Sequence, residues 1–373
     1  MKEIIVFGLS DTIGGVENYL LILQKQLEQQ VRFLFFAESG KNMYAEQIIS
    51  HHGEMVYIPR EEGIRVYIRT LHEKLKEYRK RTDTIYLNVS NYSHERLILL
   101  RFAKRLNYKV IIHSHAAKLN RIERVIHRMT HQMIKQLSLR YVDDCVRLAV
   151  SQRAGRFLYG NRSFQVLSPG IDLNRFIFDP QVRENHRAQH HCGNRFVVGF
   201  VGRMVEIKNP EFAIDVFHEL CQIVGKEKAL LMMIGDGTLL EAMKQKAAAL
   251  ELKAEVLFLG ASDQVNRDLQ AMDCLIGTSL SEGMPLNIME AQAAGLPVIC
   301  ARDRYPREIA VSSLVKMIPL EVGAKAWAEE IVSIMNQEQN IDRAKRLQDL
   351  MPSLTCFDQI KVAQSLYEHL TSD

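Results

Sequence analysis

Residues 196–210 read FVVGFVGRMVEIKNP, and this stretch decides the fold of the chain. The apolar run 196–201 has the length and composition of a strand that is buried on both faces. The loop that follows leads to Pro210, which suits the first turn of a helix, with Asn209 as its N-cap. A strand, a loop and a helix in this order predict one unit of a parallel sheet.

The same order of apolar run and helical pattern repeats along the whole chain. The expected strands form two series, 2–9, 31–37, 54–58, 84–89, 109–113 and 147–150, and then 196–201, 229–234, 256–259, 274–278, 297–300 and 315–318. Two series predict an α/β protein with two doubly wound, Rossmann-like domains, each with a parallel sheet. Ligands bind beyond the carboxyl ends of such strands, so we expect the two domains to face each other across a cleft.

A polar stretch at 179–194, rich in charge and histidine, marks the expected break between the domains. We expect a hinge in or just before it, with an N-terminal domain at 1–170 and a C-terminal domain at 171–355. The consecutive residues His190, His191 and Cys192 resemble a metal cluster, but three neighbours in sequence cannot all converge on one ion. We therefore interpret this stretch as a solvated linker.

The net charge of +4 hides an asymmetry between the two halves of the chain. Residues 1–170 hold 27 Lys and Arg against 16 Asp and Glu, or +11, and the remainder holds 21 against 28, or −7. This distribution suggests that the first half faces an anionic partner, such as membrane lipid, a lipid-linked phosphate or nucleic acid. The segment 118–140 borders an apolar stripe with arginines, which fits a helix on a bilayer surface or one packed on its own domain.

Composition excludes several other classes of protein. The hydrophobic content of 47% excludes disorder, and the apolar runs have the length of strands rather than membrane spans. The N-terminus passes directly into such a run without a cleavage site, so we expect no signal peptide and a cytosolic protein. The six cysteines are scattered without a Cys-x-x-Cys pair, which favours buried thiols.

Residues 281–291, SEGMPLNIMEA, place two carboxylates eight residues apart. Pro285 suits the first turn of a helix that Gly295 ends, so Glu282 lies in a loop and Glu290 roughly 7 to 8 Å along the helix axis. A nucleotide sugar fits these points, with sugar hydroxyls at Glu282, phosphates at the helix N-terminus and ribose at Glu290. A capped helix with two solvated glutamates is the alternative.

Two cations follow the strand at 196–201. Arg203 and Lys208 flank the loop that leads to the next helix, where they could bind a diphosphate and stabilise its charge as a leaving group. Ordinary surface positions are the alternative. The chain has no Asp-x-Asp sequence, so we expect these cations and helix dipoles to neutralise phosphate without a metal ion.

Glycines and histidines follow other strands. Gly14 and Gly15 precede an amphipathic helix and either let the backbone approach a ligand or form a tight turn. Gly235 begins a Gly-Asp-Gly turn that we interpret as mainly structural. Of His113 and His115, which alternate after the fifth strand, His115 is favoured as a ligand of sugar or phosphate, although a structural role fits equally well.

Taken together, these motifs resemble the retaining nucleotide-sugar glycosyltransferases of the GT-B type, the glycosyl transferases group 1 family, and most closely its capsular and exopolysaccharide enzymes. The resemblance implies transfer of a hexose from a nucleoside-diphosphate sugar, such as a UDP-sugar, to a lipid-linked saccharide at an anionic membrane surface, with no nucleic acid partner. It implies retention by front-face attack, in which the leaving phosphate helps to deprotonate the acceptor. It implies neither a metal nor a cofactor beyond the donor.

The resemblance also implies roles for single residues. Arg203 and Lys208 would hold the diphosphate, and Glu290 would hold the ribose. Glu282 would bind the transferred sugar, with His115 on the sugar or acceptor side. The backbone around the donor would come from Gly14, Gly15, Gly235, Gly283, Met284 and Leu286.

Two features of the chain's organisation follow from the family. A C-terminal helix in 356–373 would cross back to the N-terminal domain. Pro169 departs from the family's Pro-Asn-Gly-Ile-Asp, which puts a contact at the hinge in question. A UDP-sugar 2-epimerase of the same architecture and a non-catalytic partner subunit remain alternatives.

Overall fold

The computed structural model divides the chain into two compact units. Unit 1 comprises Met1–Gly170 and Gln359–Asp373, and unit 2 comprises Ile171–Asp358. The structure describes residues 1–11, 14–38, 42–116, 125–339 and 341–372, without the side chains of 125–131.

Unit 1 is built on a seven-stranded parallel sheet with the order β3-β2-β1-β4-β5-β6-β7. The strands are β1 Lys2–Phe7, β2 Val31–Ala37, β3 Glu54–Tyr57, β4 Thr84–Val89, β5 Lys109–Ser114, β6 Val146–Ala149 and β7 Gln165–Val166. The strand order reverses between β1 and β4, which pair in register from Ile5 opposite Ile85. The central strands are apolar and buried on both faces, as the unbroken runs predict.

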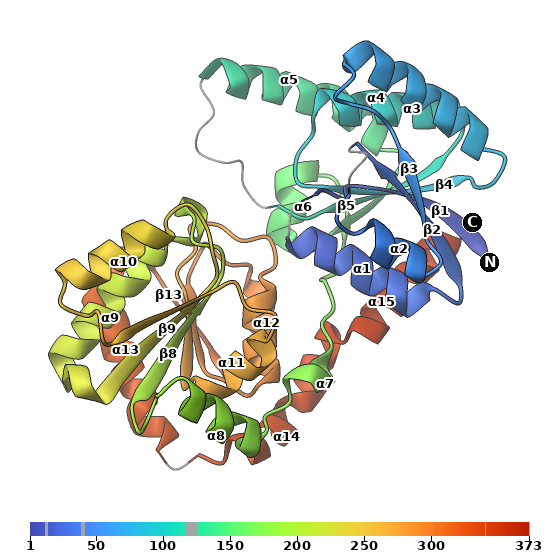
Figure 1. Ribbon diagram of the computed structural model, residues 1–373. Helices are drawn as coiled ribbons and strands as arrows, with labels where there is room; N and C mark the ends of the chain where they lie inside the picture. Colours follow the sequence, from blue (N-terminus) through green and yellow to red (C-terminus); the bar gives the residue numbers. More distant parts are fainter. Residues whose placement is uncertain (12–13, 39–41, 117–124, 340, 373) are drawn as a thin grey trace. The chain divides into compact units, whose positions relative to one another are not determined.

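Helices cover both faces of this sheet (Figure 1). On one face α1 packs against the C-terminal helix α15, and on the other α4 packs against α3 and α5. The helices are α1 Gly15–Leu27, α2 Ala45–Ser50, α3 Ile64–Tyr78, α4 His94–Arg105, α5 Val125–Val142, α6 Gln152–Tyr159 and α15 Gln359–Thr371. The buried face of α1 carries Tyr19, Leu20, Leu23 and Leu27, which are among the residues of its predicted apolar stripe.

Unit 2 is built on a six-stranded parallel sheet with the order β10-β9-β8-β11-β12-β13. The strands are β8 Phe196–Val201, β9 Ala229–Ile234, β10 Val256–Gly260, β11 Cys274–Gly277, β12 Val298–Ala301 and β13 Val315–Ile318. Here the order reverses between β8 and β11. Crevices for ligands form where the strand order of such a sheet reverses, so this point positions the site described below.

The helices of unit 2 also lie on both faces of its sheet (Figure 1). They are α7 Leu173–Phe176, α8 Pro180–Gln189, α9 Pro210–Val224, α10 Leu240–Ala249, α11 Val265–Ala271, α12 Leu286–Ala293, α13 Ala324–Glu338 and α14 Arg343–Leu354. α9 packs on α13, and α8 packs on α11. Trp327, fully buried in α13, contacts Phe212 of α9 edge to face at 5.5 Å between ring centroids.

The expected linker at 179–194 is wrong, because most of this segment is helix α8. Asp179 caps the helix by accepting from the backbone N–H of Gln181 and of Val182. Arg183 and Arg187 then form ion pairs of 2.5 and 3.0 Å with Asp273, just before β11. These pairs fix α8 to unit 2, so its charge is structural rather than solvated.

The chain passes between the units twice, after Gly170 and after Asp358, and hydrogen bonds join the residues at these two places. The backbone N–H of Ile171 donates to the carbonyl of Phe357, and Ile171 forms an isolated bridge with Asp358. These contacts keep 356–358 in unit 2, three residues beyond the expected boundary. In unit 1, a side chain at Gly170 would place its Cβ 2.4 Å from the Cα of Gln359, so this close approach requires glycine.

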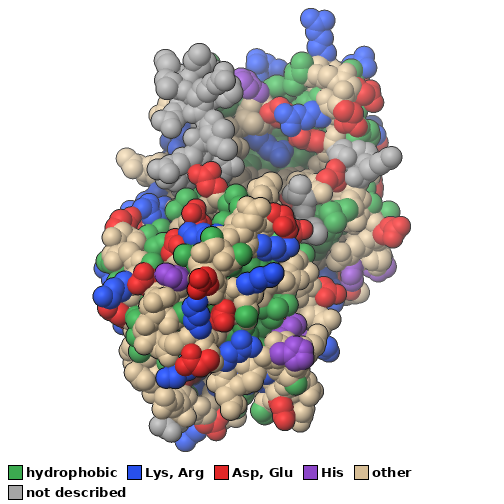
Figure 2. All heavy atoms as spheres, turned by 60° about the vertical axis from the view of Figure 1, so that its left-hand side comes forward, with side chains coloured by type: hydrophobic (Ala, Val, Ile, Leu, Met, Phe, Trp, Pro, Cys, Tyr) green, Lys and Arg blue, Asp and Glu red, His purple; other side chains and the backbone are tan. Residues whose placement is uncertain are grey.

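The surface of unit 2 that faces the viewer in Figure 2 carries Lys and Arg interspersed with Asp and Glu, without a patch of one charge.

Of the cysteines, four are buried as expected, Cys356 is exposed and Cys145 is intermediate. Among the described residues, no helix combines the length and apolarity needed to cross a bilayer. Of the proposed membrane segment 118–140, residues 118–124 lie outside the described residues, and 125–140 belong to α5, without the side chains of 125–131.

Candidate functional site

The loops after β8 and β11 are joined by hydrogen bonds at the point where the strand order of unit 2 reverses. Thr278 Oγ1 donates to the carbonyls of Lys208 and Asn209, at 3.1 and 2.9 Å. Asn209 Nδ2 donates back to the carbonyl of Thr278, and the N–H of Leu280 donates to Ile207. Asn209 precedes Pro210 as predicted, but it joins the two loops and does not cap α9 with its side chain. The two loops therefore form one rigid edge.

This edge brings two predicted site residues into direct contact. Lys208, in a short 3₁₀ turn (η1, Glu206–Lys208), places its Nζ 2.6 Å from Oε1 of Glu282. Both side chains are largely buried, with 24% and 12% exposed. Arg203, one residue past the first glycine of the loop, is exposed and has no ion-pair partner among the described residues. A cation and a cation–carboxylate pair thus line the carboxyl ends of β8 and β11.

Asn287 also belongs to this edge, although its sequence position did not single it out. Its Nδ2 donates to the carbonyl of Val201, the last residue of β8, at 2.7 Å. This bond fixes the first turn of α12 against the strand. Gly283 and Met284 lie in the loop before α12, and Leu286 is its first residue. The first-turn amides have no acceptor within the helix, so they are available to an anion.

Glu290 lies one turn into α12 and is half-buried. Its carboxylate has no hydrogen-bond partner among the described residues. Burial raises its pKa to about 7, and the nearby positive charge of Arg175 lowers it only in part. A half-buried carboxylate without a protein partner can accept hydrogen bonds from hydroxyl groups of a ligand. Gly295, in the left-handed conformation at φ 66°, ends the helix as predicted.

Gly235 and Gly237 serve the packing of the edge. A side chain at Gly235 would place its Cβ 2.0 Å from the carbonyl oxygen of Gly202, and one at Gly237 would meet Met204 at 2.5 Å. Both glycines also have positive φ, at 134° and 153°. The backbone of Met204 bonds to this turn on both sides, through Asp236 and Leu239. The turn thus holds the loop that carries Arg203.

In unit 1, Gly14 and Gly15 meet different surroundings at the start of α1. A side chain at Gly14 would collide with the carboxylate of Glu17, at 2.4 Å from Oε2. Glu17 bends back to accept from the hydroxyl of Ser10 at 2.6 Å, so Gly14 makes room for this bond. A side chain at Gly15 would meet no atom within 4 Å. Packing within unit 1 therefore explains Gly14 but does not require glycine at Gly15.

His113, within β5, and His115, just after it, differ in their bonding. His113 is fully buried, accepts from the hydroxyl of Tyr86 at Nδ1 and donates from Nε2 to the carbonyl of Leu167. Burial lowers its pKa to about 3, so this histidine is a neutral, structural group. His115 is half-buried and donates from Nε2 to Asn88 Oδ1 at 2.8 Å.

The orientation of Asn88 fixes the tautomer of His115. Asn88 Nδ2 donates to the carbonyl of Phe7 at 3.3 Å, which leaves Oδ1 to accept from His115. The Nδ1 atom of His115 is then the unprotonated acceptor. Burial lowers the pKa of His115 well below its usual range, and His113 adds to this effect. His115 can therefore accept a hydrogen bond near neutral pH but carries no charge.

Unit 1 contains two overlapping cavities of about 500 and 400 Å³ beside the carboxyl end of β1. Asn88 lines the smaller one, next to its partner His115. Both cavities are lined by Gly8, Ser10, Glu38, Arg60 and Arg96. Arg60 is paired with Glu38 and with Glu95, whereas Arg96 has no ion-pair partner among the described residues. Sequence reasoning singled out neither arginine, although Arg60 follows the expected strand 54–58 as closely as Arg203 follows 196–201.

Comparisons with known proteins find similarity to glycosyltransferases. Residues 182–349 match the family model described as Glycosyl transferases group 1. EpsF of Bacillus subtilis, named as a glycosyltransferase, is 26% identical over 333 residues, which cover 85% of this chain and 84% of EpsF. The UDP-Gal:alpha-D-GlcNAc-diphosphoundecaprenol alpha-1,3-galactosyltransferase of Escherichia coli is 32% identical over 138 residues, 36% of this chain and 35% of that enzyme.

Among solved structures, Anabaena Alr3699/HepE in complex with UDP superposes over all of both chains with a TM-score of 0.82 and 19% identity. At this identity the likeness concerns the fold. The predicted fold class of two Rossmann-like, parallel-sheet domains is confirmed.

Proposed function

Because this chain is a glycosyltransferase of group 1, of the hexosyltransferase type, we propose that it transfers a sugar from a UDP-sugar to a lipid-linked saccharide in the synthesis of a surface polysaccharide. The observation that carries the proposal is the edge of unit 2, where Lys208, Glu282 and the unpartnered Glu290 follow β8 and β11. The names of two similar proteins support the choice of substrates. Alr3699/HepE was solved with UDP, and the Escherichia coli relative is named for a UDP-galactose donor and a diphosphoundecaprenol acceptor.

The donor would lie along this edge without a metal ion. Arg203 and Lys208 would bind the diphosphate together with the first-turn amides of α12, supplied by the loop from Gly283 to Leu286. Glu290 would accept from the ribose hydroxyls, and Glu282 from hydroxyls of the sugar. Gly235 would act indirectly, since it holds the loop of Arg203.

Transfer would retain the anomeric configuration by front-face attack. The acceptor hydroxyl oxygen forms a bond to the anomeric carbon as the bond to the diphosphate oxygen breaks. The leaving diphosphate keeps that bonding pair and takes the acceptor proton. Arg203 and Lys208 stabilise the charge that develops on the leaving group. His115 would accept a hydrogen bond from a hydroxyl of the sugar or acceptor.

Unit 1 would bind the acceptor. Arg60, Arg96 and Asn88 line the same cavity, and guanidinium groups bind phosphate in two-point contacts. A lipid-linked saccharide carries both phosphate and hydroxyl groups, which suits this lining. Gly15, which faces open space, would allow the backbone to approach the reacting groups.

A transfer assay tests the function. The enzyme is incubated with UDP-glucose, UDP-galactose or UDP-N-acetylglucosamine, with and without a synthetic polyprenyl-diphosphate saccharide. We expect UDP release that depends on the acceptor, and a product with the donor's anomeric configuration by NMR. Turnover of a UDP-sugar without acceptor would favour the epimerase instead, and no turnover of any donor would contradict the proposal.

We propose further that the enzyme works at the inner face of the cell membrane. The net charge of +11 in residues 1–170 supports this, as do the exposed side chains of Met133 and Leu137, one turn apart on α5. Sedimentation with vesicles containing 30% anionic lipid tests it. The triple variant Arg121→Gln, Arg124→Gln, Arg128→Gln should bind about 10²-fold more weakly at low salt, since each base contributes about 1 kcal/mol.

A charge-matched control comes from unit 2. The control variant neutralises three exposed lysines of unit 2, Lys244, Lys253 and Lys325. Its binding to vesicles should equal that of the wild type. Equal binding by both triple variants and the wild type would contradict the membrane proposal and leave the transfer activity untouched.

A further inference from the structure

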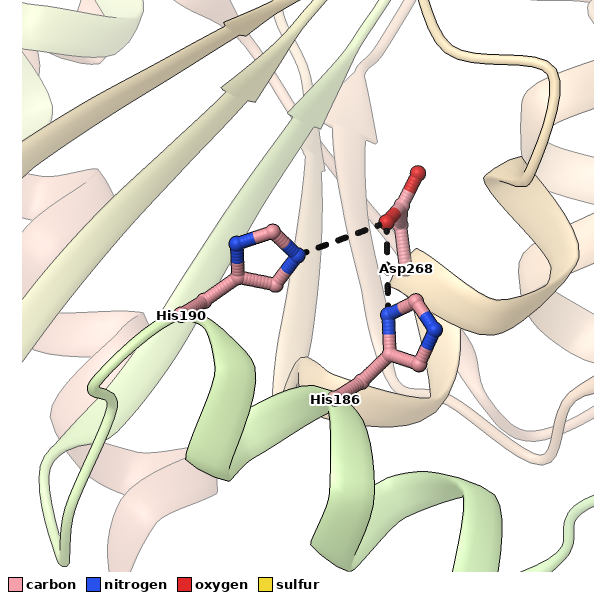
Figure 3. Close-up of side chains that lie close together, drawn as sticks. All are labelled: His186, His190 and Asp268. Carbon is pink, nitrogen blue, oxygen red and sulfur yellow. Dashed lines mark ion pairs between the residues drawn. The ribbon is translucent and has the colours of Figure 1, made fainter.

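Two histidines and an aspartate meet in unit 2, away from the loops of the donor edge. Figure 3 shows His186 and His190, one turn apart at the end of α8, directed toward Asp268 of α11. His186 Nδ1 lies 3.6 Å and His190 Nε2 lies 3.9 Å from the same oxygen of Asp268, Oδ1. The three ligand atoms lie within 4.8 Å of one another.

The burial of this cluster shows that it is not an ordinary surface ion pair. His186 is 7% exposed and Asp268 is 3% exposed. The Nδ1 atom of His186 is buried and makes no hydrogen bond. Buried polar atoms in folded proteins nearly always have a hydrogen-bond or metal partner, so this unpartnered nitrogen points to a ligand.

A second layer of contacts orients the carboxylate. The hydroxyl of Ser262 donates to Asp268 Oδ2 at 2.6 Å. This bond occupies one oxygen and leaves Oδ1 directed at the two imidazoles. Hydrogen bonds of this kind to the outer atoms of ligands are typical of metal sites.

We propose that His186, His190 and Asp268 bind a divalent transition metal ion, with Zn²⁺ as the best match. Two imidazoles and one carboxylate are ligands that zinc prefers, with metal–ligand distances of about 2.0 to 2.2 Å. In a tetrahedral site such ligands stand roughly 3.3 to 3.6 Å apart, close to the observed His–Asp distances of 3.6 and 3.9 Å. The two imidazole nitrogens, which lie within 4.8 Å of each other, would move closer together when an ion binds. A water molecule would complete the coordination.

The place of the site in the fold indicates a structural role. Arg187, on the same helix as His186, pairs with Asp273, whose carboxylate accepts from the N–H of Val197 near the start of β8. The metal would therefore lie toward the amino ends of β8 and β11, whereas Lys208 and Glu282 follow their carboxyl ends. It would clamp α8 to α11 and take no part in sugar transfer. The sequence hid this site, because only His190 of the three consecutive residues 190–192 contributes to it.

Metal binding is tested on the whole chain, in a Cys356→Ser background that removes the exposed thiol. The protein is stripped with chelator, dialysed against Zn²⁺ and analysed for bound zinc, and Co²⁺ is used as a spectroscopic probe. We expect one zinc per chain and visible cobalt absorption typical of nitrogen and oxygen ligands. At a zinc concentration 100 times the Kd, the melting temperature should rise by about 5 to 10 °C.

Variants separate this site from adventitious binding. His190→Gln, at the most exposed ligand, should fold normally and lose at least tenfold in zinc affinity, and His186→Gln should lose as much. Ser262→Ala should weaken binding by about tenfold, because the carboxylate loses its orientation. His191→Gln, at the exposed neighbour, is the matched control and should bind like the parent. No stoichiometric zinc in the parent, or equal losses in His190→Gln and His191→Gln, would overturn the proposal.

Discussion

Lys208 and Glu282 form an ion pair across the loops that follow β8 and β11, with 2.6 Å between Nζ and Oε1. The two residues are 74 positions apart in sequence, and the fold brings them together at the reversal of strand order. The pair holds a cation and a carboxylate ready at the same point, where the phosphate and the sugar of a donor would meet.

This pair makes the effects of its two residues interdependent. Lys208→Met and Glu282→Gln should each lower kcat/KM by about 10² to 10³-fold, since each removes a group that would contact the donor in the proposed site. The double variant should be at most about tenfold worse than the more affected single variant, because either change already breaks the pair. Steady-state kinetics on the four proteins measure this. Fully multiplicative losses would show that the two residues act separately.

Glu290, proposed above to bind the ribose, should lower the stability of the folded chain near neutral pH. Its pKa in the folded chain, about 7, exceeds its ordinary value of 4.5, so the folded chain binds more protons between these pH values. Stability is therefore lost as pH rises from about 4.5 to 7, and the full loss persists above 7. Glu290→Gln should stabilise the protein at pH 8 by about 2 to 3 kcal/mol and change little at pH 4.5. Urea unfolding at the two pH values checks this, and a lower stability of the variant at pH 8 would contradict it.

Because the pKa of Glu290 is raised, we expect nucleotide binding to depend on pH. Ribose hydroxyls donate to the carboxylate but not to its protonated oxygen, so UDP affinity of the wild type should rise as pH increases through about 7. The affinity at pH 6 should be roughly tenfold weaker than at pH 8. In Glu290→Gln this dependence should disappear. His115 should not contribute, since its pKa lies well below this range.

Gly14 and Gly15 provide a matched pair of substitutions. Gly14→Ala places a methyl group against Glu17 and disturbs its bond to Ser10, so we expect a loss of about 1 to 2 kcal/mol in stability. Gly15→Ala meets no atom in unit 1 and should fold at least as stably as the wild type. If a ligand approaches this backbone, Gly15→Ala should still lower kcat/KM by tenfold or more. Normal activity in Gly15→Ala would exclude such an approach.

His115 can be separated from the donor groups of unit 2. His115→Ala should lower kcat by about 10 to 10²-fold and leave the Kd for UDP within twofold of the wild type. Asn88→Ala should lower kcat by a smaller factor. It keeps the ring of His115 but removes the acceptor that holds the proton on Nε2. Kinetics and UDP titration of both variants check this. A weakened UDP affinity in His115→Ala would place the residue with the donor instead.

Much of the fold follows from the sequence because buried parallel strands are continuous apolar runs. The runs at 31–37, 84–89, 196–201 and 229–234 coincide with β2, β4, β8 and β9. β7 was missed because it has only two residues, both exposed. The helix α8 was misinterpreted because its arginines are buried by a partner, Asp273, that is distant in sequence. Local polarity does not reveal such pairing.

The candidate site shows the same division between local and distant information. Glu290, Gly295 and the order of strand and loop were predictable from local pattern. The contact between Lys208 and Glu282, the bond from Asn287 to Val201 and the cluster around Asp268 depend on which loops the topology brings together. Sequence spacing alone does not contain this information.

The most direct test of the donor site is calorimetric titration with UDP, GDP and ADP in the presence of EDTA, comparing the wild type with Glu290→Ala and Lys208→Ala. Lys244→Ala, on the surface of unit 2 and outside the proposed contacts, is the control. We expect micromolar binding of UDP by the wild type and the control, and at least a tenfold loss in both site variants. Absence of binding to all three nucleotides, or unchanged affinity in Glu290→Ala and Lys208→Ala, would contradict a metal-independent nucleotide site at this edge.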